Sequence, residues 1–301
     1  MIVRPRPNAF IMLFSWRGSI LPQIAPQLLF VILLSIIVAL FEHFHPHIFP
    51  ELPIAAFSLI GLALSIFLGF RNNVCYDRWW EARKEWGALI LHMRNFARES
   101  LLLHVDVRRR VLHRSIGFTQ TLNARLRNQN QMGIAERWLP TQEQHDYAEH
   151  PNPSDYVLLC IQRDILECYK AGQLSDICYQ QLSSRVANMA GTQAACERIR
   201  NTPVPFAYSL LIHRTAYLYS LLLPIGLGST LGFLTPVIVG LLAYTFFGLD
   251  ALGSELEQPF GILENDLPLD AMARAIEIDL LSSLGESNIP KPLQPVNFIL
   301  Q

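Results

Sequence analysis

The chain has 301 residues, of which 51% are hydrophobic and only 16% are charged. Soluble proteins carry about 25% charged residues, so this composition excludes an ordinary soluble protein and indicates a membrane protein. The net charge is −1, and the charges are segregated along the chain and not collected into one basic face, so nothing indicates a nucleic-acid partner.

Four apolar runs are each long enough to cross a bilayer as a helix. A hydrocarbon core about 30 Å thick needs about 20 apolar residues in helical form. Pro22 and Pro53 stand at the start of the first two runs, where a helix tolerates proline. The predicted spans are residues 22–42, 53–70, 205–225 and 228–252.

Lysine and arginine predict the side of the membrane on which each segment lies. Eighteen of the 24 basic residues fall between positions 71 and 206, and the loops 43–52 and 226–227 contain none. Because basic residues collect in cytoplasmic segments, both termini are predicted to be cytoplasmic in a multi-pass protein of the inner membrane. The predicted segments are an N-terminal segment with a first hairpin (1–70), a cytoplasmic helical region (71–204), a second hairpin (205–252) and cytoplasmic C-terminal helices with a tail (253–301).

Two stripes run side by side along the second span. The small residues Gly61, Ser65 and Gly69 repeat every four positions, which favours close approach of another helix. One position further on, a ridge of large apolar residues repeats with the same period, about 100° around the helix. This ridge consists of Leu62, Ile66 and Phe70.

The ridge has two interpretations. It packs against lipid or another helix, which needs no special function. Alternatively, in a symmetric ring of subunits the copies meet at the axis and stack as three hydrophobic collars, which gate a pore because water leaves narrow apolar constrictions. Four helices are too few to enclose a hydrated pore within one chain, so conduction would require an oligomer.

Two polar residues, His213 and Arg214, lie inside the third span. Such residues are costly in hydrocarbon, so we expect them to pair with a neighbour or to reach the headgroups. The two predicted hairpins run in the same direction and lack matched helix breaks, which disfavours a secondary carrier.

The segment 71–206 is predicted to be helical, with a loop at 128–153 that is rich in Asn, Gln, Pro and His. Ser154-Asp155 is expected to cap a helix that Gly172 ends. Ser175-Asp176 is expected to cap the next helix, which stops near Pro203. The tail 286–301 contains three prolines and is expected to be extended.

No enzyme signature occurs, so the sequence indicates neither an enzyme nor a cofactor. The five cysteines lack metal-ligand spacing and are expected to be buried, reduced thiols. One metal-like cluster stands in the predicted outer loop, but a short loop between prolines enforces no geometry, so no metal site is predicted. Its members are Glu42, His43, His45, His47 and Glu51.

Several of these segments together resemble a known family. The run "LALSIFLGF" followed by "CYDRWWEARKEWG", and the run "ELEQPFGILENDLPLD" at 255–270, are similar to segments of the bestrophin ion channels. The chain resembles the compact bacterial members nearly end to end. Family-motif residues with an expected structural or gating role are Arg78, Trp79, Trp80, Glu257, Pro259, Phe260, Gly261, Asn265 and Asp266.

The resemblance implies an all-α membrane protein of four spans with a large cytoplasmic domain, assembled as a homopentamer around one axial pore. Monovalent ions would pass passively, with no cofactor. The neck of the family's pore corresponds to Leu62, Ile66 and Phe70, and its lower cytoplasmic constriction corresponds to Ile177.

Ion selectivity is left open by the residues. The resemblance implies an anion channel, whereas Ile66 lacks the positive ring edge with which phenylalanine can stabilise an anion. Eight acidic against two basic residues follow position 252 and would favour Na⁺ or K⁺ if they line the exit. The segment "ILEND" supplies only Glu264 and Asp266 as acidic side chains, too few for a calcium site of six to eight oxygens.

Two functions from other classes remain alternatives to a channel. One is a membrane-anchored scaffold whose cytoplasmic helices bind partners. The other is a secondary carrier with an alternating site near Arg214.

Overall fold

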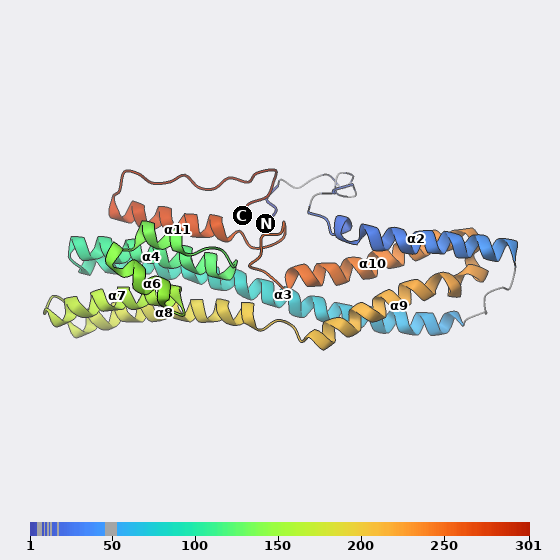
Figure 1. The fold of residues 1–301 in the computed structure, drawn as a ribbon, viewed down its shortest axis with the longest axis horizontal. Helices are drawn as coiled ribbons and strands as arrows, with labels where there is room; N and C mark the ends of the chain where they lie inside the picture. Colours follow the sequence, from blue (N-terminus) through green and yellow to red (C-terminus); the bar gives the residue numbers. More distant parts are fainter. Residues whose placement is uncertain (5–7, 9, 11, 13, 17, 46–52) are drawn as a thin grey trace. The chain divides into compact units, whose positions relative to one another are not determined.

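The computed structural model describes residues 1–4, 8, 10, 12, 14–16, 18–45 and 53–301, and all their side chains except those at 132, 135 and 136. Helices form nearly all of the regular structure in this part of the chain, and the remaining β contacts are isolated bridges such as Ile2 to Ile299. The predicted all-α class is therefore confirmed (Figure 1).

The helices follow one another in a simple order. They are α2 (Leu21–Phe44), α3 (Ile54–Glu99), η1 (Ser100–Leu102), α4 (Val105–Leu126), α5 (Met132–Trp138), α6 (Thr141–Glu149), α7 (Pro153–Lys170), α8 (Asp176–Asn201), α9 (Phe206–Leu231), η2 (Gly232–Leu234), α10 (Thr235–Leu256) and α11 (Leu269–Leu284). The 46-residue helix α3 has no break, as the lack of proline and glycine between Phe70 and Trp86 predicts.

The chain divides into two compact units by its internal contacts. The first unit comprises Met1–Arg4, Trp80–Thr202 and Pro259–Gln301, and the second comprises Pro5–Trp79 and Pro203–Gln258. The boundaries of these two units reflect contacts within the chain and not the position of a membrane. The predicted limits at 70/71, 204/205 and 252/253 concern the membrane and stay predictions.

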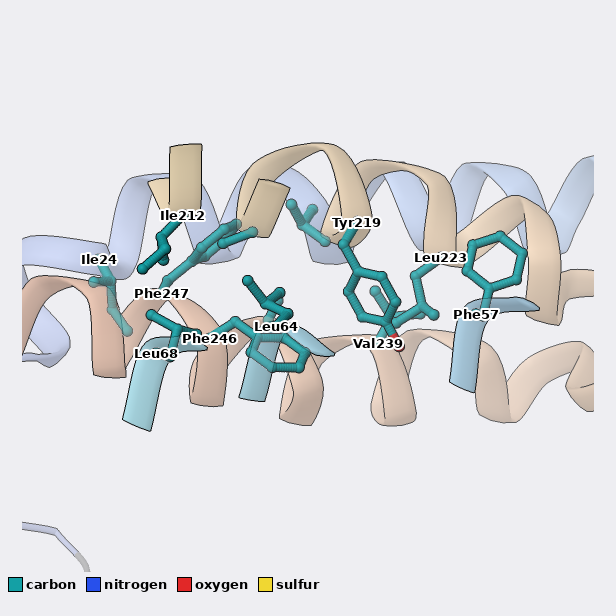
Figure 2. Packing of buried hydrophobic residues seen from close by; sticks show 13 residues of the cluster. Ile24, Phe57, Leu64, Leu68, Ile212, Tyr219, Leu223, Val239, Phe246 and Phe247 are labelled. Carbon is teal, nitrogen blue, oxygen red and sulfur yellow. The ribbon is translucent and has the colours of Figure 1, made fainter. Parts of the chain in front are cut away.

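The second unit is a bundle of apolar helices. Helices α2, α9 and α10 pack against one another in pairs, as Figure 1 shows, and the N-terminal part of α3 joins them through its buried side chains. Figure 2 shows Leu64 and Leu68 of α3 within the same cluster as Ile212, Phe246 and Phe247. Leu64 and Leu68 therefore mark the packed side of α3 in this unit.

By length and composition, three helical runs in the described residues could cross a membrane: Leu21–Phe44, Ile54–Leu102 and Phe206–Leu256. The third run contains α9 and α10, which η2 joins. At 1.5 Å per residue α9 is about 39 Å long and α10 about 33 Å, so each alone matches the thickness of a bilayer core. The count of four spans stays a prediction.

The predicted turn at 226–227 is wrong. Helix α9 continues to Leu231, and the chain turns at Gly232, whose φ of 51° few residues other than glycine adopt. Gly228 lies inside the helix, and a Cβ there would be 3.4 Å from Val38 Cγ1 of α2. This glycine therefore serves close packing of α9 against α2.

In the first unit, α4 packs against α7 and α11, and α7 packs against α8. The predicted loop at 128–153 contains two helices, α5 and α6, so that prediction is wrong. Tertiary contacts outweigh the weak local propensity of this segment. Trp138 Nε1 donates to Gln120 Oε1 at 2.9 Å, and the hydroxyls of Tyr147 and Thr121 lie 3.0 Å apart.

The predicted helix ends in this unit are largely confirmed. Gly172 follows α7 with φ 72°, and Ser175 caps α8 by accepting a hydrogen bond from Cys178 N at 3.3 Å. Helix α7, however, is capped by Asn152, whose Oδ1 accepts from Asp155 N, and not by Ser154-Asp155. Helix α7 begins two residues earlier than the sequence suggests because Pro153 is favourable in a first turn.

The tail after α11 has little regular structure, as predicted. The cysteines are all free, and Cys75, Cys160, Cys168 and Cys196 are buried, which confirms the expected state for four of them. Cys178 is only partly buried because it lies in the first turn of α8.

Candidate functional site

The large apolar ridge of the second span lies on the outer side of α3. Leu62, Ile66 and Phe70 are 60%, 48% and 59% exposed in the single chain, whereas Leu64 and Leu68 on the packed side are 2% and 0% exposed. Exposure of large side chains on this scale is common on a membrane-facing or subunit-facing surface. The ridge therefore lies largely outside the core of its own chain.

The small stripe has two different environments within the subunit. At Gly61, a Cβ would lie 2.7 Å from the Tyr219 hydroxyl oxygen, so this glycine permits close packing of α3 on α9. Ser65 donates a hydrogen bond to the Gly61 carbonyl oxygen at 2.8 Å. At Gly69, no described atom would lie within 4 Å of a Cβ. The stripe is therefore only partly used inside one chain.

A buried ion pair follows directly after the ridge. Arg71 is 2% exposed, and its Nη1 donates to Asp250 Oδ1 at 2.5 Å, while Asp250 is 6% exposed. The other carboxylate oxygen of Asp250 lies 2.6 Å from His213 Nδ1. His213 thus pairs with a neighbour, as predicted for a polar residue inside an apolar helix.

Sequence reasoning missed Asp250. An acidic residue in the otherwise apolar run 228–252 is a signal for a buried partner, since a charge in such a run is rarely left uncompensated. No feature of the sequence identifies Arg71 as that partner. Arg214 is exposed, and its side chain has no hydrogen bond or ion pair to a described residue.

Two of the family-motif residues connect segments of the second unit. Glu257 Oε1 accepts a hydrogen bond from Val204 N at 3.0 Å, and its Oε2 lies 3.8 Å from Arg71 Nη2. Arg78 Nε donates to the Glu257 carbonyl oxygen at 3.2 Å. The segment before α9 and the C-terminal end of α10 are therefore both held to α3.

The two motif tryptophans are adjacent but differ in surroundings. Trp79 is partly buried, and its ring stacks on Tyr76 with centroids 6.3 Å apart. Trp80 is exposed. Their expected place at the lipid headgroups stays a prediction.

The remaining motif residues form a tight loop in the first unit. Pro259 O accepts from Leu267 N at 3.0 Å, and Phe260 is buried. The buried carboxylate of Asp266 accepts from Leu263 N at 2.7 Å, so it stabilises the turn from Leu263 to Asp266. Pro259 and Asp266 thus hold this loop together by hydrogen bonds to backbone N–H groups.

Ile177 is the second residue of α8 and is 77% exposed. The preceding Asp176 accepts a hydrogen bond from the Tyr169 hydroxyl at 2.9 Å, and the Tyr169 ring stacks on Tyr179 with centroids 4.7 Å apart. These contacts hold the first turn of α8 in place. An exposed large apolar side chain at a rigid helix start has no partner inside its own unit.

The acidic residues after position 252 are mostly engaged within the chain. Seven of the eight have partners: Glu255 with Gln23, Glu257 with Val204, Asp266 with Leu263, Asp270 with Arg127, Glu277 with Arg274, Asp279 with Arg94, and Glu286 with His113. The eighth, Glu264, also interacts within the chain. These carboxylates are therefore mostly held by hydrogen bonds or ion pairs within the chain, which gives no support to the expectation that they line a cation exit.

The His-rich cluster of the predicted outer loop is described only in part. His43 lies against Phe233 with ring centroids 5.0 Å apart, while His47 and Glu51 lie outside the described residues. Within the part of the chain that is described, no group of three or more His, Cys, Asp or Glu side chains could hold a metal ion.

Comparison with known proteins places this geometry in a family. The family described as "Bacterial/Fungal Bestrophin protein" matches residues 1–282. A voltage-dependent anion channel-forming protein of Mesorhizobium japonicum is 44% identical over 301 residues, covering 99% of this chain and 96% of its own. A relative of the same description from Escherichia coli is 40% identical over 297 residues, covering 98% of both chains.

Solved structures agree. A crystal structure of a bacterial bestrophin homologue from Klebsiella pneumoniae has a TM-score of 0.84 at 37% identity, covering 87% of this chain and 99% of that one. A single-substitution variant of that homologue gives 0.85 at 37% identity, with 90% and 100% covered.

These matches place the chain in a family of channel-forming membrane proteins and not in a family of enzymes. The chain belongs to the bacterial and fungal bestrophin family, as its sequence motifs suggested.

Proposed function

We propose that the chain is a passive ion channel that assembles as a homopentamer and conducts monovalent ions through one axial pore. Leu62, Ile66 and Phe70 would form its hydrophobic neck, and Ile177 its cytoplasmic constriction. The observation that carries this proposal is the exposure of the whole ridge on the side of α3 that faces away from the subunit core. Around an axis of symmetry, such a ridge meets its own copies.

The free part of the small stripe supports an oligomer. Gly69 has open space beside it in the single chain, and it lies one residue before the last ridge residue. A neighbouring subunit's helix can approach closely at such a position. Gly61, which already packs on Tyr219, would hold α3 within its own subunit, and Ser65 lies between the two.

We further propose four membrane spans, with both termini and the segment 71–204 in the cytoplasm. The distribution of basic residues and the separate lengths of α9 and α10 support this topology. Trp79 and Trp80 would then lie near the cytoplasmic headgroups of the lipid bilayer, where indole rings are enriched. The loop from Pro259 to Asp266 would be a cytoplasmic element that influences opening.

The ion is proposed to be an anion. The relatives with 40% to 44% identity are named as anion channel-forming proteins. The cation alternative finds no support in these relatives, and the carboxylates on which it rested are engaged. Selectivity would then arise in the neck and the entrance rather than from a ring of free carboxylates.

Purified protein in liposomes tests the proposal. A chloride gradient alone is expected to drive flux, Ile66→Ala is expected to change it, and asymmetric NaCl is expected to give a reversal potential near that of chloride. A potential near that of sodium would overturn the choice of ion. Saturable flux that needs a second solute and ignores position 66 would point to a carrier, and absence of flux would leave the scaffold.

A further inference from the structure

The direction of the ridge depends on how α3 is rotated about its own axis. The packed side of α3 is apolar near the ridge, where Leu64 and Leu68 fill the core. Apolar contacts are non-directional, so they resist a small rotation of a helix only weakly. A rotation of a few tens of degrees would nevertheless carry Ile66 away from a pore axis.

Within the ridge segment, the Tyr208 hydroxyl donates a hydrogen bond to the Phe67 carbonyl oxygen at 3.3 Å. A set of buried directional contacts follows one residue after the ridge. Arg71 Nη1 donates to Asp250 Oδ1 at 2.5 Å and to the Asp250 carbonyl oxygen at 3.3 Å, and its Nη2 donates to Ser254 Oγ at 2.9 Å. The Ser254 hydroxyl in turn donates to the Asp250 carbonyl oxygen at 3.0 Å. A planar guanidinium held at both ends in this way has one orientation.

The carboxylate of Asp250 is itself held from the other side. His213 Nδ1 lies 2.6 Å from Asp250 Oδ2, and the His213 ring packs on Tyr217 with centroids 4.4 Å apart. Tyr217 packs on Phe247, one turn before Asp250, at 4.6 Å. Asp250 therefore joins α3, α9 and α10 at a single buried point.

The Arg71 guanidinium lies between two carboxylates. Arg71 faces Asp250 and, at 3.8 Å, Glu257, while Glu255 bonds to Gln23 of α2 at 2.5 Å. Loss of the Asp250 charge would leave Arg71 buried with only the more distant Glu257, which is a costly arrangement.

Backbone packing reinforces the same contact. A Cβ at Gly253 would collide with the Asn72 side-chain oxygen and would lie 3.6 Å from Arg71 Cζ. Helix α10 therefore lies close to α3 beside the ion pair, and a side chain at position 253 would displace the Asn72 amide.

We propose that Asp250 is a positioning residue for the neck: through Arg71 and His213 it fixes the rotation of α3 and thereby the direction of Leu62, Ile66 and Phe70. This inference rests on the proposed function, because a direction matters only if the ridge faces a shared axis. Asp250 acts through Arg71 and does not touch the ion.

The test compares chloride flux and the iodide-to-chloride permeability ratio in liposomes for wild type, Asp250→Asn and the double variant Arg71→Gln/Asp250→Asn. Thermal stability of each assembled protein is measured in parallel. Asp250→Asn is expected to change chloride flux by about tenfold, within the range of mutations in coupling networks, and to shift the permeability ratio. The double variant leaves no stranded charge, so it is expected to regain stability but not the wild-type ratio.

Asp279→Asn is the matched control. It removes the same charge from the exposed pair of Asp279 with Arg94 and is expected to leave flux and ratio unchanged. If Asp250 acts on stability alone, the permeability ratio will follow the melting temperature, and the double variant will restore both. That result would overturn the proposal. Unchanged flux and ratio in Asp250→Asn would also overturn it.

Two further results keep the outcome decisive. If Asp250→Asn does not assemble, the permeability ratio of the double variant decides the test. Ser254→Ala removes one of the directional bonds and is expected to shift the permeability ratio in the same direction. If the double variant also fails to assemble, an unchanged ratio in Ser254→Ala overturns the proposal. If Ile66→Ala leaves flux unchanged, the neck itself is wrong. If Ile66→Ala changes flux and the Asp250 variants do not, only the positioning role is wrong.

Discussion

The ring of Phe57 on α3 lies directly over Gly226 on α9, so close that a Cβ at position 226 would be 2.6 Å from the Cζ atom of the ring. Phe57 belongs to the buried core of the helix bundle, as Figure 2 shows, and has little room to move. The close packing of α3 on α9 at this point therefore depends on the absence of a side chain at position 226.

Gly226→Ala is expected to destabilise the protein by about 1–3 kcal/mol, the usual cost of overpacking a core. The measurement is the melting temperature in detergent. Gly191→Ala on α8 is the control, since a Cβ there would meet no described atom within 4 Å. That variant is expected to be neutral or up to about 1 kcal/mol more stable. Equal melting temperatures for the two variants would contradict the close contact.

Ile66→Asn is expected to raise ion flux by about tenfold, which corresponds to a barrier lowered by about 1.4 kcal/mol. A polar ring would keep the constriction wet, whereas isoleucine favours its drying. The control is Ile60→Asn, an exposed position about 120° around the helix from Ile66. Flux through liposomes is the measurement, and an equal rise in both variants would show that the ridge has no special direction.

Only Cys178 is expected to react quickly with a thiol reagent near neutral pH, because the thiolate is the reactive form. Cys178 is partly exposed, whereas burial, the largest cause, raises the pKa of Cys160 to about 11. Burial likewise raises the pKa of Cys196. Labelled thiols are counted by mass spectrometry. We expect one labelled thiol in the folded wild-type chain, none in folded Cys178→Ser and five in the denatured wild-type chain. Rapid labelling of Cys160 would contradict its burial.

His92→Gln is expected to reduce the loss of stability in mild acid. Burial, and then the charge of Arg185, lower the pKa of His92 below its usual 6.5. The unfolded chain therefore takes up the proton first, so this residue costs stability as the pH falls below about 6.5. Melting temperatures at about pH 7.5 and about pH 5.5 provide the measurement.

The control for this variant is His145→Gln, which changes an exposed histidine on α6. It should show the same acid sensitivity as the wild type. If His92→Gln also matches the wild type, the buried imidazole is not a source of acid sensitivity.

The sequence by itself determined the apolar spans, the unbroken helix α3 and the ridge of Leu62, Ile66 and Phe70. These features follow from local periodicity and from the length that a bilayer requires, and both can be read along a single chain. The cap of α8 and the end of α7 at Gly172 were predictable for the same reason, since capping acts within a few residues.

Other features became known only from the tertiary structure. The pairing of Arg71 with Asp250 joins positions 179 residues apart, and no local pattern selects that partner. Helices α5 and α6 form in a segment of loop-like composition because Trp138 and Tyr147 find partners on α4. Whether Gly61 or Gly69 is in contact likewise depends on which helix lies beside it. Long-range packing decides such matters because it selects among partners that a local sequence leaves equally possible.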